Sequence, residues 1–98
     1  MSNQIAETIR QQIGHKALYM IGAKNLLAHD DALSFKIGRN SKSVNYVKIT
    51  LTPADLYDIK FSWVTKNGEK VRSSEEGIYV DMLHGAIERN TGMYTKLF

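Results

Sequence analysis

The sequence has 98 residues, of which 43% are hydrophobic and 23% are charged, and its formal net charge is +3. This length and composition fit one ordinary globular domain over residues 1–98 and exclude a disordered chain. The absence of cysteine excludes disulfide frameworks, cysteine zinc sites and iron–sulfur clusters. No apolar run approaches the ~20 residues that a membrane span needs, and the amino-terminal segment lacks the pattern of a secretory signal. We therefore expect a cytoplasmic protein without a membrane partner.

The first predicted element is a helix over residues 3–13, because isoleucine recurs there at every fourth position. A second stretch with apolar residues at helical spacing runs from residue 15 to Gly22. Gly14 lies between the two stretches, and a glycine inside a helix costs about 1 kcal/mol relative to alanine. We therefore expect either one helix that bends at Gly14 or two short helices.

The middle of the chain predicts strands. Apolar and polar residues alternate over residues 33–37, 46–51 and 57–63, as they do in strands with one buried face. Asn67-Gly68 is a strong hairpin signal, which predicts a returning strand that includes Val71. Together these segments predict an antiparallel meander of four or five strands, with one polar and one apolar face.

The segment after the meander predicts a carboxy-terminal amphipathic helix. We expect it to open at Ser73, with a capping box between Ser73 and Glu76, and to stop at Gly92. Its apolar stripe at helical spacing is formed by Tyr79, Met82, Leu83, Ala86 and Ile87. The predicted fold class is therefore α+β, with the helices on one face of the sheet.

Charge is unevenly distributed along the chain. Residues 33–72 hold eight bases and three acids, whereas residues 73–98 hold two bases and four acids. Alternation places several lysines on the polar face of the sheet, where cations can neutralise phosphate and an aromatic ring can stack on a base. The loop at residues 38–43 also has a composition suited to an anion nest. The candidate residues for binding a nucleic acid or nucleotide are Lys36, Arg39, Asn40, Lys42, Tyr46, Lys48 and Lys60. The alternative is that these cations only solvate the sheet and protect its edges.

Four large apolar side chains gather at the carboxy-terminal end of the sequence: Met93, Tyr94, Leu97 and Phe98. One interpretation is that they fold back on the helices and complete the core. The other is that they form an interface with a second copy or with another protein, as small domains often need.

The sequence offers little for catalysis or metal binding. Its three histidines, His15, His29 and His84, lie on separate predicted elements and do not have the spacing of a zinc signature. No nucleophile motif, glycine-rich phosphate loop or paired carboxylates are evident. We therefore expect a protein that is not an enzyme and uses no metal and no cofactor.

Several segments carry a resemblance that spans nearly the whole chain: IGAKNLLA, LSFKIGRNSKSVNYVKITL, DLYDIKF and ERNTGMYTKL. They resemble a family of small proteins carried by bacterial phages and other mobile elements. The resemblance brings no catalytic residues. It implies a setting in which short accessory proteins bind and inhibit host defence components, or bind nucleic acid.

The expected function is therefore that of a non-enzymatic accessory protein in the host bacterial cytosol. It would bind and inhibit a host protein, most concretely a component of bacterial immunity, or bind itself as a homo-oligomer, or do both. One alternative is a DNA- or RNA-binding protein that uses the basic sheet face, which would bind less tightly as salt rises. The other is a protein that sequesters an anionic nucleotide.

Overall fold

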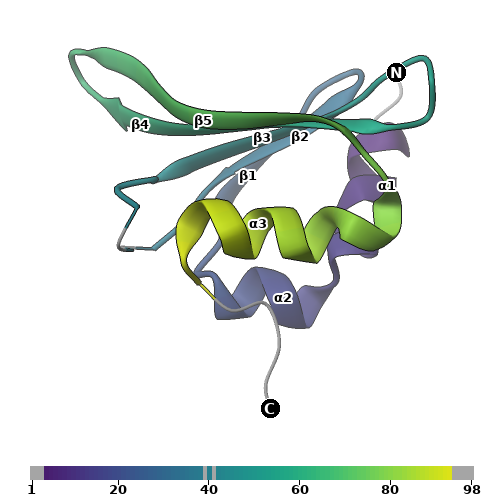
Figure 1. Cartoon of the computed structure of the whole chain (residues 1–98), viewed down its shortest axis with the longest axis horizontal. Helices are drawn as coiled ribbons and strands as arrows, with labels where there is room; N and C mark the ends of the chain where they lie inside the picture. Colours follow the sequence, from purple (N-terminus) through teal and green to yellow (C-terminus); the bar gives the residue numbers. More distant parts are fainter. Residues whose placement is uncertain (1–3, 39, 41, 94–98) are drawn as a thin grey trace.

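The chain runs from two short helices through five strands to a final helix (Figure 1). The computed structural model describes residues 4–38, 40 and 42–93. Its elements in chain order are α1 (Gln4–Ile13), α2 (His15–Met20), β1 (Lys24–Ala28), β2 (Ala32–Lys36), β3 (Tyr46–Leu51), β4 (Tyr57–Thr65), β5 (Gly68–Ile78), the 3-10 turn η1 (Val80–Met82) and α3 (Leu83–Thr91).

The five strands form one sheet in the order β1-β2-β3-β4-β5, and every neighbouring pair is antiparallel. This confirms the predicted meander. The β4–β5 hairpin also forms where Asn67-Gly68 predicts it, with Thr65 paired to Gly68. Gly68 has φ +130°, a conformation that residues with a Cβ rarely adopt, which explains the glycine at this turn.

All three helices lie on one face of the sheet, and the β4–β5 hairpin extends beyond them (Figure 1). This confirms the α+β class and the predicted two-layer arrangement. The core lies between the layers, and the largest of its fully buried side chains include Ile9 and Ile13 of α1, Phe35 of β2, Val47 and Ile49 of β3, Ile59 and Phe61 of β4, and Leu83 and Ile87 of α3. We call the sheet face turned away from the helices the outer face.

The predicted break at Gly14 is confirmed. Gly14 has φ +93° and ψ +147°, which ends α1 and lets α2 start in a new direction. The backbone remains hydrogen-bonded across the break, because Gly14 N–H donates to the Arg10 carbonyl and Leu18 N–H donates to the Gly14 carbonyl. Neither helix spans more than 10 residues, and no helix in the described part of the chain is long and apolar enough to cross a membrane.

The predicted start of the last helix is wrong. Ser73 and Glu76 do not form a capping box, because residues 68–78 are strand β5, where Ser73 pairs with Phe61 and Glu75 with Ile59. Two long-range side-chain interactions from α3 also hold this segment: Ser73 Oγ donates to Asn90 Oδ1, and Arg89 pairs with Glu75. These contacts, which a local pattern does not reveal, outweigh the helical signal.

The later start of α3 divides the predicted apolar stripe. Leu83, Ala86 and Ile87 are buried, as the helical spacing predicts. Tyr79 and Met82 lie before the helix, and both are exposed. Tyr79 has an extended backbone and directly precedes the η1 turn, and Met82 is the last residue of that turn. The apolar residues predicted to share one buried face thus include two that face the surface.

Candidate binding sites

The register of the sheet brings four of the candidate residues together on the outer face. Lys36 lies opposite Tyr46 across β2 and β3, and Lys48 lies opposite Lys60 across β3 and β4. Directly paired residues point to the same side of an antiparallel sheet. The prediction that these side chains share the polar face is therefore confirmed, while their role in binding stays a prediction.

Glu69 reduces the positive charge of the outer face. Its Oε2 lies 3.1 Å from Lys60 Nζ and accepts a hydrogen bond from Ser62 Oγ at 2.6 Å. The Ser62 hydroxyl, and then Lys60, hold the pKa of the Glu69 carboxyl below its ordinary value, so this carboxylate is charged at neutral pH. Sequence reasoning missed this pairing, because it depends on the register between β4 and β5.

A depression of about 330 Å³ lies over β3, β4 and β5, close to these lysines. Lys48 and Lys60 contribute its positive charge. Its lining also includes Asp58, Glu75 and Glu76, so that carboxylates outnumber cations. The charge around this depression therefore does not favour a phosphate.

The loop between β2 and β3 is held by Asn40. The Asn40 side chain donates to the carbonyls of Gly38 and Val44 at 2.9 and 2.5 Å. Its Oδ1 accepts from the N–H groups of Lys42 and Val44 at 3.1 and 3.2 Å. Asn40, a candidate ligand residue, thus uses its amide to fix the loop that carries Lys42. Arg39, another candidate, lies outside the described residues.

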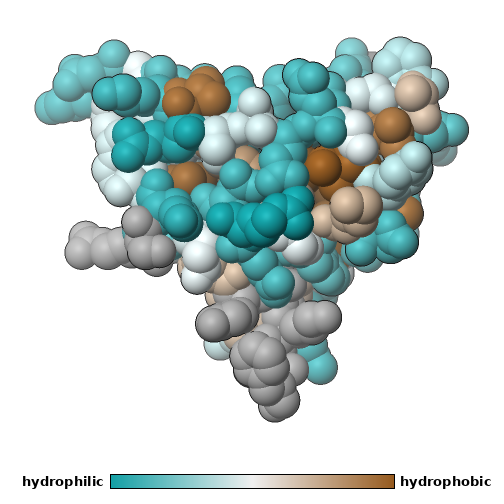
Figure 2. All heavy atoms as spheres, in the orientation of Figure 1, coloured by the Kyte–Doolittle hydropathy of each residue, from teal (hydrophilic) through white to brown (hydrophobic). Residues whose placement is uncertain are grey.

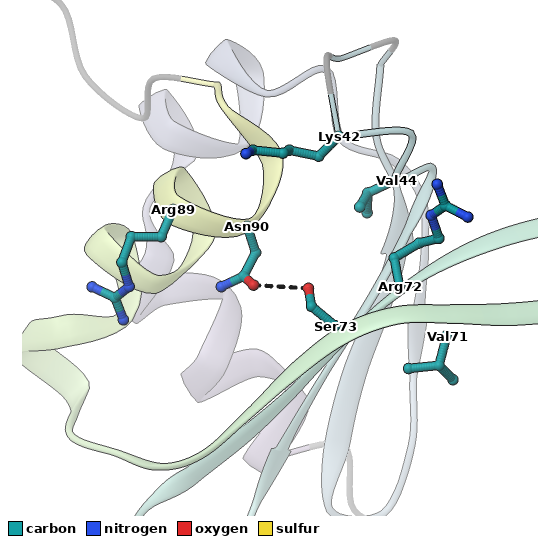
Figure 3. A pocket seen from close by; sticks show the side chains of 7 residues that line it. All are labelled: Lys42, Val44, Val71, Arg72, Ser73, Arg89 and Asn90. Atoms are coloured by element: carbon teal, nitrogen blue, oxygen red, sulfur yellow. Dashed lines mark hydrogen bonds between the residues drawn. The ribbon is translucent and has the colours of Figure 1, made fainter.

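A larger pocket of about 400 Å³ lies between this loop, β5 and α3 (Figure 3). Figure 3 shows Lys42 reaching from the loop toward α3, and Arg72 rising from β5. Ser73 and Asn90 face each other within it, joined by a 2.8 Å hydrogen bond. We call this site the Lys42–Arg72 pocket. Of its polar residues, the sequence singled out only Lys42 as a candidate for binding.

Arg72 reaches this pocket because β5 contains a bulge. Val71 pairs with Ser62 and Ser73 pairs with Phe61, which leaves Arg72 without a partner residue on β4. A bulge of this kind redirects a side chain from the alternating pattern of the strand. The sequence did not predict this bulge, because the residues that follow Arg72 resemble the start of a helix.

The charges of the Lys42–Arg72 pocket are only partly compensated. Arg89 also lines it, but Arg89 Nη2 lies 2.6 Å from Glu75 Oε1, and this interaction holds the pKa of Glu75 below its ordinary value. The side chains of Lys42 and Arg72 form no hydrogen bond or ion pair with any other described residue. Two cations of the pocket are therefore free to meet an anion.

The other candidate surface is apolar. Tyr79, Val80 and Met82 are 60%, 47% and 45% exposed, although all three are large apolar side chains. We call these three residues the η1 patch. In Figure 2, hydrophobic atoms also gather at the right of the view, where Figure 1 places the passage from β5 to α3. Such grouping marks interaction sites more often than isolated exposed residues do.

The predicted interface at the carboxy-terminal end is described only at Met93. Met93 is partly buried and packs against the core, which agrees with the first interpretation for this residue. Tyr94, Leu97 and Phe98 lie outside the described residues. Other exposed apolar side chains are scattered over α2, β1, β4 and β5: Tyr19, Leu26, Leu27, Trp63 and Val71.

Two of the histidines have structural hydrogen bonds. His29 Nε2 lies 2.8 Å from Ser34 Oγ, and His84 Nε2 lies 2.6 Å from the carbonyl oxygen of Ile13, which links α3 to α1. Within residues 4–38, 40 and 42–93, no three His, Asp or Glu side chains are grouped as a metal ion would require.

The chain was also compared with known proteins. The comparisons with protein-family models, with curated proteins and with solved structures found no match. The η1 patch and the Lys42–Arg72 pocket are thus two features of the molecule that bear on its function.

Proposed function

We propose that this protein is a non-enzymatic binding protein whose partner is a host protein, and that the η1 patch is the docking surface. The observation that carries the proposal is the exposure of three large apolar side chains within four consecutive residues. Burying apolar surface stabilises a complex by roughly 25 cal/mol per Å² before the costs of association are subtracted. Burial of the η1 patch would therefore contribute affinity for a partner, whereas a turn with only polar side chains would not.

The backbone around the η1 patch supports this role, because it is already ordered. Tyr79 is extended, with φ −73° and ψ +154°, and Met82 N–H donates to the Tyr79 carbonyl at 2.9 Å. This bond closes the turn that presents Tyr79 and Val80. A turn that is fixed before binding loses less conformational entropy when the partner arrives.

The charge next to the η1 patch indicates the chemistry of the partner. Asp81 lies within the same turn and is exposed. A partner with an apolar groove and a lysine or arginine at its rim would complement both the apolar side chains and this carboxylate. The resemblance to phage and mobile-element proteins supports a host setting, and inhibition of a component of bacterial immunity is the function we propose there.

Site-specific photo-crosslinking in the bacterial host tests this proposal. A photoreactive phenylalanine analogue at position 79 is expected to crosslink to one discrete host protein. The same analogue at Tyr19, an exposed aromatic residue on α2, is the matched control and should not give that product. The captured host protein, once purified, should bind the wild type about tenfold more tightly than the V80S/M82S variant.

Three results would contradict the proposal. Crosslinking of position 79 only to a second copy of the chain would assign the η1 patch to self-association. Identical crosslinked products from positions 79 and 19 would indicate chance encounters. Binding of the purified partner to V80S/M82S as tightly as to wild type would place its docking surface elsewhere.

A second candidate function, nucleic-acid binding by the outer face, is favoured by the shared face of Lys36, Tyr46 and Lys48. Gel-shift assays at low salt with single- and double-stranded DNA and RNA test it. Retardation that weakens steeply as salt rises, and that decreases in Lys48→Gln, would support it. The absence of any retardation at low salt would exclude it.

A further inference from the structure

We propose that the Lys42–Arg72 pocket binds the phosphate group of a small phosphorylated molecule. This site is separate from the η1 patch and does not depend on the function proposed for that patch. The inference rests on three features of the pocket: the charges at its rim, the hydrogen-bonded network on its floor, and its size.

The charges at the rim favour a dianion. The described lining residues include Lys42, Arg72 and Arg89 but no carboxylate. Glu75, which lies outside the lining, neutralises Arg89, so that Lys42 and Arg72 remain without a counter-charge among the described residues. A phosphate monoester carries close to two negative charges at neutral pH, which equals the summed charge of these two cations. Figure 3 shows the Lys42 amine turned toward α3 and the Arg72 guanidinium turned away from it, so the exposed Arg72 side chain has to turn toward Lys42 for both to contact one phosphate. The planar guanidinium of Arg72 also suits two phosphate oxygens at once.

The floor of the pocket keeps a carboxylate away from the anion. Ser73 Oγ donates to Asn90 Oδ1 at 2.8 Å, and Asn90 Nδ2 donates to Glu75 Oε2 at 2.5 Å and to the Ala86 carbonyl at 2.8 Å. These bonds fix Asn90 between the pocket and Glu75. The Glu75 carboxylate therefore interacts with Arg89 and Asn90. It does not neutralise Lys42 or Arg72, which remain available to the ligand.

Hydrogen bonds from Asn40 support the backbone at Lys42. Asn40 Oδ1 accepts from Lys42 N–H, and the Asn40 amide also binds the carbonyls on both sides of the loop. The backbone that carries Lys42 is therefore held in place. The side chains of Lys42 and Arg72 have to settle on the ligand, whereas the loop backbone is already fixed, which limits the entropy lost on binding.

The size of the pocket indicates a small molecule. Its volume of about 400 Å³ falls within the range of roughly 300–1,000 Å³ that is usual for small-ligand sites. Val44 and Val71 give it an apolar portion, and among the residues that the structure describes no aromatic side chain lines it on which a base could stack. The phosphate is therefore the group that the pocket recognises.

The test measures binding of inorganic pyrophosphate, a nucleoside monophosphate and a short single-stranded oligonucleotide to the full chain. Calorimetry gives the affinity, and backbone amide NMR shifts give the location. We expect pyrophosphate or the nucleotide to bind and to shift the amides of Ser73 and Asn90. Arg72→Gln and Lys42→Gln should each weaken binding about tenfold. Lys66→Gln, at the exposed hairpin turn, is the matched control for loss of one charge and should have no such effect.

Several outcomes would overturn this proposal. Equal weakening by Lys66→Gln and Arg72→Gln would show only general charge attraction. Binding of the oligonucleotide alone would exclude a small molecule as the ligand. Amide shifts confined to residues outside the pocket, or no binding of any probe, would remove the site. Because V80S/M82S leaves the pocket intact, that variant should bind these probes as wild type does, so the two proposals can fail separately.

Discussion

Asn45 completes the hydrogen bonding of Val64 at the place where β4 continues past the start of β3. Asn45 Oδ1 accepts from Val64 N–H at 2.7 Å, and Asn45 Nδ2 donates to the Val64 carbonyl at 2.8 Å. The side-chain amide thus acts as a substitute for one residue of a neighbouring strand. It extends the pairing of β4 on its β3 side beyond the last backbone partner, Ser62.

Replacing Asn45 tests the importance of this interaction. We expect Asn45→Ala to lower the free energy of unfolding by about 1–3 kcal/mol, because two partly buried backbone groups lose their partner. The measurement is urea denaturation of both proteins. Asn67→Ala is the control, because the Asn67 side chain forms no hydrogen bond with a described residue, and its effect should stay within about 0.5 kcal/mol. Equal effects of the two variants would contradict this role for Asn45.

The Gly14 junction should be sensitive to a side chain for a purely backbone reason. A Cβ at Gly14 would meet no atom within 4 Å, but φ +93° is strained for any residue that has a Cβ. Gly14→Ala should therefore lower the free energy of unfolding by about 1–3 kcal/mol.

Gly85 in α3 is the matched control for this substitution. Its φ is not in the strained range, and its Cβ would meet Arg89 Nη1 at 3.5 Å, an ordinary contact. Gly85→Ala should stabilise by about 0.4–1 kcal/mol, because it restricts the unfolded chain. Thermal or urea unfolding that shows the same sign for both variants would refute the explanation.

Phe61 and Trp63 should differ in how much they contribute to stability. Both lie on the helix-facing side of β4, but Phe61 is 0% exposed, whereas Trp63, on the projecting hairpin, is 43% exposed. Phe61→Ala should cost about 3–5 kcal/mol, since it leaves a cavity in the core. Trp63→Ala should cost much less. Denaturation of the two variants measures the difference, and a larger loss for Trp63→Ala would show that the hairpin packs more tightly than its exposure indicates.

Glu69 should make the stability depend on acid pH. Its pKa is lowered from 4.5 in the folded protein, so its ionised form stabilises the fold above the unfolded pKa, and this contribution is lost as the pH falls through the folded pKa. We expect the free energy of unfolding to decrease as the pH falls below about 5, toward and past the lowered pKa of Glu69. Glu69→Gln should show a smaller decrease than wild type. Glu76→Gln, at an exposed carboxyl without an ion pair to a described residue, should keep the wild-type slope.

The sequence predicts those parts of the fold that depend on local patterns. Alternation in β2, β3 and β4 identifies the buried Phe35, Val47 and Phe61, and Gly14 marks the junction between helices. The segment from Ser73 to Glu76 is different, because its residues suit a helix start as well as an edge strand. The choice is made by pairing with β4 and by bonds to Arg89 and Asn90, which lie 14–17 residues away in the chain.

The candidate sites are less accessible to sequence reasoning for the same reason. Lys42 is recognised from the composition of its loop, and the shared face of Lys48 and Lys60 follows from strand alternation. Arg72 enters the pocket only through a bulge, and Glu69 reaches Lys60 only through the β4–β5 register. Tyr79 and Met82 in the η1 patch are exposed because α3 begins later than the helical pattern predicts.

The sequential order of the five strands has a consequence for how the chain folds. Every sheet neighbour is also a chain neighbour, so each hairpin closes only a short loop, and the entropy lost at each step is small. The contact between His84 and Ile13 spans 71 residues and joins the helices from the two ends of the described chain. Assembly of the sheet should therefore be rapid, and the slow step should be the meeting of α1 with α3, which seals the core only after the meander exists.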